Sequence, residues 1–201
     1  MNSLPVIVAM ALEIEEQGAF EAAGVPVLYT GVGKVNATYA LTRRLAALER
    51  ASERRRIVLN LGTAGSSRFP IGSLVACCAF VQRDMDASAL GFERSVTPFD
   101  RFEPVLRFPT MFPDLLQGVC GSGDSFATSA LDGRVDVFDM EAYALARVCA
   151  LEGVNFACVK FITDDADTHA AASWQENLAR ASREWLALYE RLLRAATASS
   201  S

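Results

Sequence analysis

The chain has 201 residues, a formal net charge of −5 and an apolar fraction of 51%. These values predict one soluble domain with enough apolar side chains for a sizeable core. The sequence shows no basic face, which argues against nucleic acid as a partner. It also shows no apolar run long enough to span a bilayer, which argues against a membrane protein.

Strand-like and helix-like segments alternate along the chain. Apolar runs predict strands at 6–10, 25–29, 57–61, 74–81, around Val119, 135–138 and 156–162. Helical periodicity predicts helices at 13–23, 35–48, 140–152 and from about 173 onward. The alternation predicts an α/β fold: a single-domain, three-layer α/β/α sandwich with a central mixed sheet. We expect the domain to cover 1–194, followed by a frayed tail at 195–201.

The segment 84–116 is the least regular part of the chain. Four prolines interrupt every pattern there, at Pro98, Pro104, Pro109 and Pro113. A loop of this length in a compact domain is typical of a lid or an interface.

The five cysteines show no Cys-x-x-Cys spacing, and the N-terminus shows no targeting pattern. We therefore expect reduced thiols in a cytoplasmic protein, with no metal site and no cofactor.

Acidic residues follow two of the predicted buried strands. Glu13 comes after the first strand, and Asp164 comes after the last. Ligands of open parallel sheets bind outside the carboxyl ends of the strands, so both carboxylates are expected in one cleft. Glu13 has a structural alternative, since acids are favoured in the first turn of a helix. The acidic cluster at Asp164, Asp165 and Asp167 has no such alternative and indicates a functional site.

Other candidate site residues are weaker when each is taken alone. The loops 31–34 and 60–65 carry glycines after strands, which suits either a ligand or a tight turn. Phe126 taken alone is more often a core residue than a platform for a base, and Glu141 lies at a helix start where acids are common. His169 is the only histidine, which argues against a Ser-His-Asp hydrolase.

Six motifs taken in order resemble the purine nucleoside phosphorylase and uridine phosphorylase superfamily. Within it they most resemble the 5′-methylthioadenosine/S-adenosylhomocysteine nucleosidases. The motifs lie at 9–13, 30–37, 60–65, 123–126, 139–142 and 163–167. The resemblance covers nearly the whole chain.

The resemblance implies cleavage of the N-glycosidic bond of a purine nucleoside, plausibly a 5′-modified adenosine. Glu13 would activate water as general base, and Asp164 would protonate the purine as general acid. Glu141 would bind the ribose hydroxyls and Phe126 would stack on the base. The full set of expected substrate-binding residues is Met10, Thr63, Ala64, Gly65, Phe126, Met140, Glu141 and Thr163.

The motifs leave several activities open. The loops 10–13 and 60–65 contain no arginine for a phosphate, so hydrolysis is favoured over phosphorolysis. A futalosine-type nucleosidase and an inactive nucleoside-binding relative would carry the same motifs. The chain is shorter than typical nucleosidases, which leaves the 5′ substituent open, and Lys160 stands where the family more often has arginine. The family also implies a homodimer, with 98–113 as the region contacting the partner, and a role in nucleoside metabolism such as methionine salvage.

Overall fold

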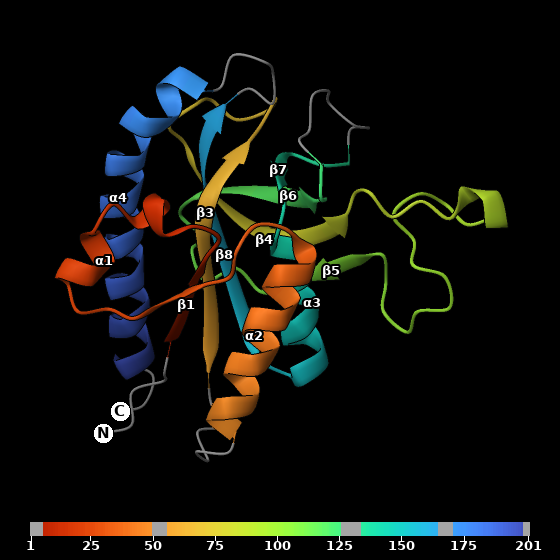
Figure 1. Ribbon diagram of the computed structural model, residues 1–201, viewed down its shortest axis with the longest axis horizontal. Helices are drawn as coiled ribbons and strands as arrows, with labels where there is room; N and C mark the ends of the chain where they lie inside the picture. The colour runs from red at the N-terminus through yellow and green to blue at the C-terminus, as the bar shows by residue number, and fades with distance from the viewer. Residues whose placement is uncertain (1–5, 50–55, 126–133, 165–170, 199–201) are drawn as a thin grey trace.

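The computed structural model describes residues 6–49, 56–125, 134–164 and 171–198 (Figure 1). Its centre is an 8-stranded sheet. The strands are β1 (Val6–Met10), β2 (Val27–Tyr29), β3 (Ile57–Gly65), β4 (Leu74–Gln82), β5 (Val105–Arg107), β6 (Leu116–Ser122), β7 (Val137–Asp139) and β8 (Asn155–Asp164).

The sheet is mixed and partly closed. Its order is β2-β1-β3-β7-β6-β4-β5, and β8 pairs with both β3 and β4. The β1, β2, β3 and β8 pairings are parallel, whereas β4 runs antiparallel to β8. Because β8 pairs with both β4 and β3, the strands β3, β7, β6, β4 and β8 form a closed ring of paired strands. The carboxyl ends of β1, β2, β3 and β8 all point to one edge, where the chain leaves the sheet.

Helices cover both faces of the sheet. The helices α2 (Lys34–Glu49) and α3 (Ala142–Glu152) lie on one face, and α4 (Ala171–Ala198) lies on the other (Figure 1). Side chains of each strand alternate between the two faces. In β1, Ile7 joins the core layer under α2 and α3, while Val8 joins the layer that contains Trp185 of α4. The predicted three-layer α/β/α architecture is confirmed.

The first predicted helix, 13–23, is broken in two. A 3₁₀ turn, η1 (Glu13–Glu16), is followed by the short α1 (Ala19–Ala22). Gln17 and Gly18 lie between them with φ of 49° and 75°, in the left-handed region that ends a right-handed helix. At the other end of the chain α4 continues to Ala198, so part of the expected tail 195–201 is helical, and 199–201 lie outside the described residues.

The irregular segment divides into an arm and a part packed on the body. Residues 84–104 project from the sheet and contain a short 3₁₀ turn, η2 (Ser88–Leu90) (Figure 1). Arg147 of α3 holds the base of this arm: its Nη2 donates to Asp100 Oδ1 at 2.7 Å, and its guanidinium lies 4.2 Å from the Phe102 ring centroid. Farther along, Phe112 is buried in the core beneath α4. Among the described helices, none is long and apolar enough to cross a membrane.

Candidate active site

The candidate site lies where several strands end. Hydrogen bonds from Thr30 N to Met10 O (2.9 Å) and from Gly31 N to Ala11 O (3.0 Å) hold the β2 exit beside the β1 exit. Asp164 pairs through its backbone with Gly65 at the end of β3. The expected convergence of chain segments at this edge of the sheet is therefore present.

Glu15 of η1 is the carboxylate that reaches the end of β3. Its side chain is buried, and Oε1 accepts hydrogen bonds from the Thr63 amide (2.9 Å) and the Thr63 hydroxyl (3.0 Å). The Leu12 amide donates to Oε2 at 3.2 Å. A carboxylate has roughly four acceptor positions, so these contacts leave about one position on Oε2 for a further donor such as water.

Glu13, which the sequence motif predicts as the general base, does not make these contacts with Thr63. Its side chain is exposed, whereas Glu15 two residues later is buried. In a 3₁₀ turn, with three residues per turn, residues two apart point to different sides. The sequence shows acids at 13, 15 and 16 but not which side of the turn faces inward. Glu16 is also buried, and it accepts hydrogen bonds from the Phe20 and Glu21 amides at the start of α1.

Glu141 is the N-cap residue immediately before α3 and faces the same region. The Gly33 amide donates to its Oε1 at 2.8 Å. Burial, together with the negative charge of Asp139, raises the pKa of Glu141 to about 7, and Glu15 adds to this shift while Lys160 opposes it. Glu141 therefore exchanges between its neutral and charged forms near neutral pH.

The predicted glycine loop after β2 is held by neighbouring loops. Gly33 has a φ of 92°, and the next amide, that of Lys34, donates to Asp124 Oδ1 at 2.8 Å. Lys34 Nζ lies 2.5 Å from Asp84 Oδ1, and the Asp124 amide donates to Asp84 Oδ2 at 2.9 Å. The β2, β4 and β6 exits are thus tied together beside Glu141.

The remaining expected residues are placed as follows. Thr63 and Gly65 lie at the β3 exit, and Met140 is half-buried beside Glu141. Met10, Ala64 and Thr163 are buried, with exposed fractions of 0%, 5% and 2%, so they offer a ligand almost no surface. Phe126 and the side chain of Asp164 lie outside what the structure describes. Within the described ranges, no group of three His, Cys, Asp or Glu side chains could hold a metal ion.

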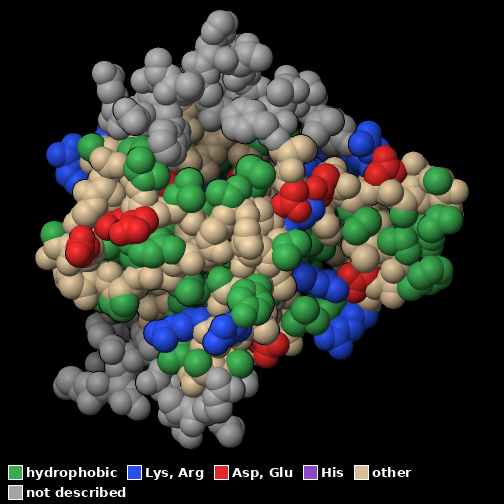
Figure 2. Space-filling view, viewed as in Figure 1, with side chains coloured by type: hydrophobic (Ala, Val, Ile, Leu, Met, Phe, Trp, Pro, Cys, Tyr) green, Lys and Arg blue, Asp and Glu red, His purple; other side chains and the backbone are tan. Residues whose placement is uncertain are grey.

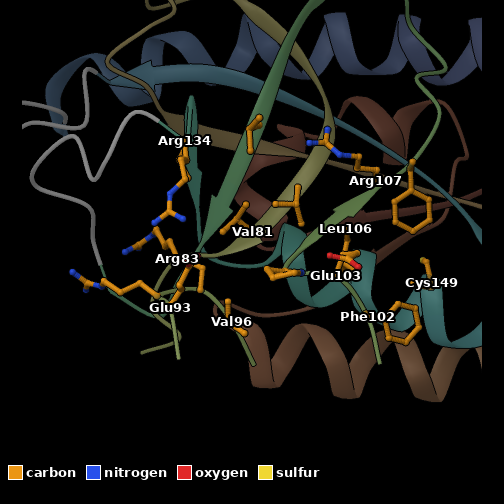
Figure 3. Close-up of a pocket in the computed structure, with 18 of the residues that line it drawn as sticks. Val81, Arg83, Glu93, Val96, Phe102, Glu103, Leu106, Arg107, Arg134 and Cys149 are labelled. Carbon is orange, nitrogen blue, oxygen red and sulfur yellow. The ribbon is translucent and has the colours of Figure 1, made fainter. Parts of the chain in front are cut away.

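A cavity of about 1050 Å³ lies elsewhere, between the base of the arm, β5 and the end of α3. Val81, Leu106 and Phe102 are among its apolar lining residues, and Arg83 and Arg134 lie close together at one end (Figure 3). Arg83 also donates from Nη2 to the Gly123 carbonyl at 3.2 Å. Glu15, Thr63, Glu141 and Lys160 do not line this cavity, so it is separate from the candidate active site.

Comparison with known proteins identifies the family of the chain. A sequence model described as the phosphorylase superfamily matches residues 16–194. The chain belongs to this superfamily. It is 27% identical over 224 residues to a 5′-methylthioadenosine/S-adenosylhomocysteine nucleosidase of a Marinomonas species, covering 96% of this chain and 94% of that protein. It is 29% identical over 192 residues to the Haemophilus influenzae nucleosidase of the same name, covering 86% and 82%.

Solved structures of superfamily members share the fold. The Helicobacter pylori 5′-methylthioadenosine/S-adenosylhomocysteine nucleosidase, solved in complex with a substituted pyrrolidin-3-ol, superposes with a TM-score of 0.82 at 22% identity, covering 96% of this chain and 99% of that one. Futalosine hydrolase of the same organism gives a TM-score of 0.81 at 21% identity, covering 96% and 98%. At this identity the likeness establishes the nucleoside phosphorylase-like fold.

Proposed function

We propose that this protein hydrolyses the N-glycosidic bond of a purine nucleoside, with a 5′-modified adenosine such as 5′-methylthioadenosine or S-adenosylhomocysteine as substrate. The observation that carries the proposal is the Glu15 carboxylate held against Thr63 at the end of β3, on the same side of the sheet as Glu141. The curated relatives named above are nucleosidases, which supports the same reaction.

The charges around the site favour water over phosphate as the nucleophile. Glu15, Asp139 and Glu141 are buried carboxylates, and Lys160 is a buried ammonium bound to Asp139 at 2.8 Å. An incoming phosphate would meet this excess of negative charge and would be repelled. A sugar that becomes oxocarbenium-like as the base departs would be stabilised by the same charge.

Each residue then has a chemical role. Glu15 takes a proton from the attacking water, whose oxygen bonds to C1′ of the ribose as the bond to the purine breaks. Asp164 donates a proton to the departing purine at N7, so that the base leaves neutral. Glu141 accepts hydrogen bonds from ribose hydroxyls. The Gly33 amide, which donates to Glu141 Oε1, holds the carboxylate in place for this role. Thr63 fixes the orientation of Glu15 through two hydrogen bonds.

The test incubates the protein with 5′-methylthioadenosine, S-adenosylhomocysteine, adenosine, inosine and futalosine, each with and without phosphate. Free base and sugar products are separated by chromatography. Base release that does not depend on phosphate is the expected result. A sugar 1-phosphate that forms only with phosphate would replace hydrolysis by phosphorolysis, and base release from futalosine alone would assign the other nucleosidase type.

We further propose a homodimer formed through an apolar surface beside the site. This surface does not include 98–113, the region that the sequence analysis expects to contact the partner. This surface, here called the apolar patch, lies on η1, the β2 exit and the start of α2, on the face shown in Figure 2. Its exposed members are Leu12, Ile14, Tyr29, Val32, Val35 and Tyr39. Val35 is 78% exposed and Tyr39 63%, and large exposed apolar side chains that gather on one face mark protein interfaces. Val35→Glu is expected to give monomers in sedimentation velocity, whereas Leu151→Glu, at an exposed site on α3, leaves the dimer intact.

The state of the cysteines supports a proposal for the cellular setting. All five cysteines are free, and four of them are buried, which suits a reducing compartment such as the cytoplasm. Hydrolysis of 5′-methylthioadenosine would place the protein in nucleoside metabolism, in methionine salvage.

A further inference from the structure

A buried ion pair lies beside the proposed active site. Lys160 on β8 and Asp139 at the end of β7 approach to 2.8 Å, with side chains 2% and 1% exposed. Burial alone would raise the pKa of Asp139, but the Lys160 ammonium holds that pKa below its usual value. Burial alone would lower the pKa of Lys160, but the charge of Asp139 raises it well above the usual value. Both groups are therefore charged at neutral pH.

Asp139 also fixes the start of α3. Its Oδ2 accepts a hydrogen bond from the Ala142 amide at 2.9 Å, and its Oδ1 accepts one from the Ser122 hydroxyl at 2.5 Å. The Tyr143 amide in turn donates to Ser122 Oγ at 2.8 Å. Glu141 is the residue just before Ala142, so the backbone on both sides of Glu141 is held by this cluster.

Lys160 reaches toward Glu15 across a glycine. Gly62 on β3 pairs with Lys160 on β8. A Cβ at Gly62 would lie 3.4 Å from Lys160 Nζ and 3.4 Å from Glu15 Oε1. The Lys160 ammonium and the Glu15 carboxylate therefore both border the space beside Gly62, which has no side chain to fill that space.

We propose that Lys160 and Asp139 are positioning residues for the hydrolysis: their ion pair, anchored to α3 and facing Glu15 across Gly62, sets the relative placement of Glu15 and Glu141. This inference rests on the proposed function. The Lys160–Asp139 ion pair connects β8 to β7 and to the start of α3. On its other side, Lys160 lies next to Glu15 of η1 in the space left by Gly62. A change in the pair would therefore move two carboxylates that must act on one sugar.

The two charges of the pair act on Glu141 in opposite directions. Asp139 on β7 and Glu15 on η1 raise its pKa, while Lys160 on β8 and the Gly33 amide lower it. The thiols of Cys120 and Cys77 remain neutral, because burial raises the pKa of Cys120 to about 12, and hydrogen bonds with Cys120 and Cys158 raise that of Cys77. The loss of either partner should therefore shift the titration of Glu141 with a sign that depends on which charge was lost.

The experiment compares Lys160→Met, Asp139→Asn and the double variant Lys160→Met/Asp139→Asn. Each single variant leaves a buried charge without its partner and is expected to lower Tm, whereas the double variant removes both charges and should recover most of the stability. Its kcat should nevertheless remain about 100-fold below wild type, because misplacement by about 1 Å costs that much. A double variant that recovers both Tm and kcat would show that the pair is only structural.

The pH dependence of kcat/KM gives a second readout. In Asp139→Asn the loss of a negative charge should lower the pKa of Glu141, so the acidic limb should move to lower pH. In Lys160→Met the loss of a positive charge should raise the pKa of Glu141, so the acidic limb should move to higher pH. Shifts of the same sign, or no shift, would overturn the positioning role.

Gly62→Ala tests the inference without touching a charge, in case the Lys160 variant does not fold. The added methyl fits at van der Waals distance, so Tm should stay near the wild-type value. The methyl also fills the space between Lys160 and Glu15, and kcat is expected to fall at least about 10-fold. A normal kcat in Gly62→Ala would show that the open space between Lys160 and Glu15 has no part in the hydrolysis. Failure of the wild type to release base from any nucleoside would instead refute the proposed function.

Discussion

The choice between Glu13 and Glu15 as general base is the sharpest test of the site. The two residues lie on the same 3₁₀ turn and differ by burial and contacts: Glu13 is exposed, whereas Glu15 is 4% exposed and bound to Thr63. Glu15→Gln and Glu13→Gln therefore make the same chemical change at neighbouring positions. One variant serves as the matched control for the other.

The magnitudes follow from the contacts. General base catalysis contributes about 10²–10⁴ in rate, so kcat of Glu15→Gln should fall by that factor. An amide has one acceptor oxygen, so it can accept from Thr63 or from Leu12 but not from both, and the unpaired donor should cost about 1–3 kcal/mol of unfolding free energy. Glu13→Gln alters an exposed side chain, and its effect should stay within about 0.5 kcal/mol, about twofold in kcat/KM.

The assay is release of adenine from 5′-methylthioadenosine under saturating substrate, with urea unfolding of each variant measured in parallel. Near-normal kcat in Glu15→Gln combined with a large loss in Glu13→Gln would reject the base assigned from the structure. Equal losses in both variants would show that η1 rearranges when substrate binds.

Three further predictions concern pH, the core and the arm. The pKa of Glu141 is raised to about 7 from 4.5, so the native state holds more protons than the unfolded state between these values and stability falls as pH rises through this range. Glu141→Gln should remove that loss, on the order of 3 kcal/mol, in urea unfolding at pH 5 and pH 8. Trp185→Ala removes a fully buried ring that packs against Phe161 and should cost about 3–5 kcal/mol of unfolding free energy, while Trp185→Phe costs less. Asp100→Asn weakens the contact with Arg147 and should speed hydrogen exchange in 93–104 without changing exchange in α4; unchanged exchange in 93–104 would contradict the anchoring described above.

The architecture could be predicted from sequence because hydrophobic periodicity reports which faces are buried. The run Val6–Met10 became β1 with the predicted bounds, and the apolar stripe of the last helix, which includes Trp185 and Leu192, became the core contact of α4. The strand β3 runs to Gly65, past its predicted end at residue 61. Glycine and threonine carry a weak strand signal, so pairing with β8 decided this extension.

The site was harder to predict, because side-chain direction depends on local backbone geometry. Three acids within four residues, Glu13, Glu15 and Glu16, have similar propensities, but one is exposed, one reaches Thr63 and one caps α1. The left-handed residues Gln17 and Gly18 end the 3₁₀ turn that carries these acids, where one continuous helix was expected. Glu141 was predicted only through the resemblance of the motif 139–142 to the superfamily, because an acid at a helix start is common for structural reasons alone.

The balance of charge links the fold to the choice of nucleophile. Buried carboxylates gather at the strand ends because three separate segments deliver them: η1 brings Glu15, the β7 exit brings Asp139, and the start of α3 brings Glu141. Such a cluster would be unstable without a cation, and Lys160 supplies it from β8, the strand that closes the sheet between β3 and β4. Lys160 is held by Asp139, however, so it is not free to bind an anion from solution. A neutral water can approach the open position on Glu15, whereas phosphate would need a cation that this site has already paired, and the geometry therefore favours hydrolysis over phosphorolysis.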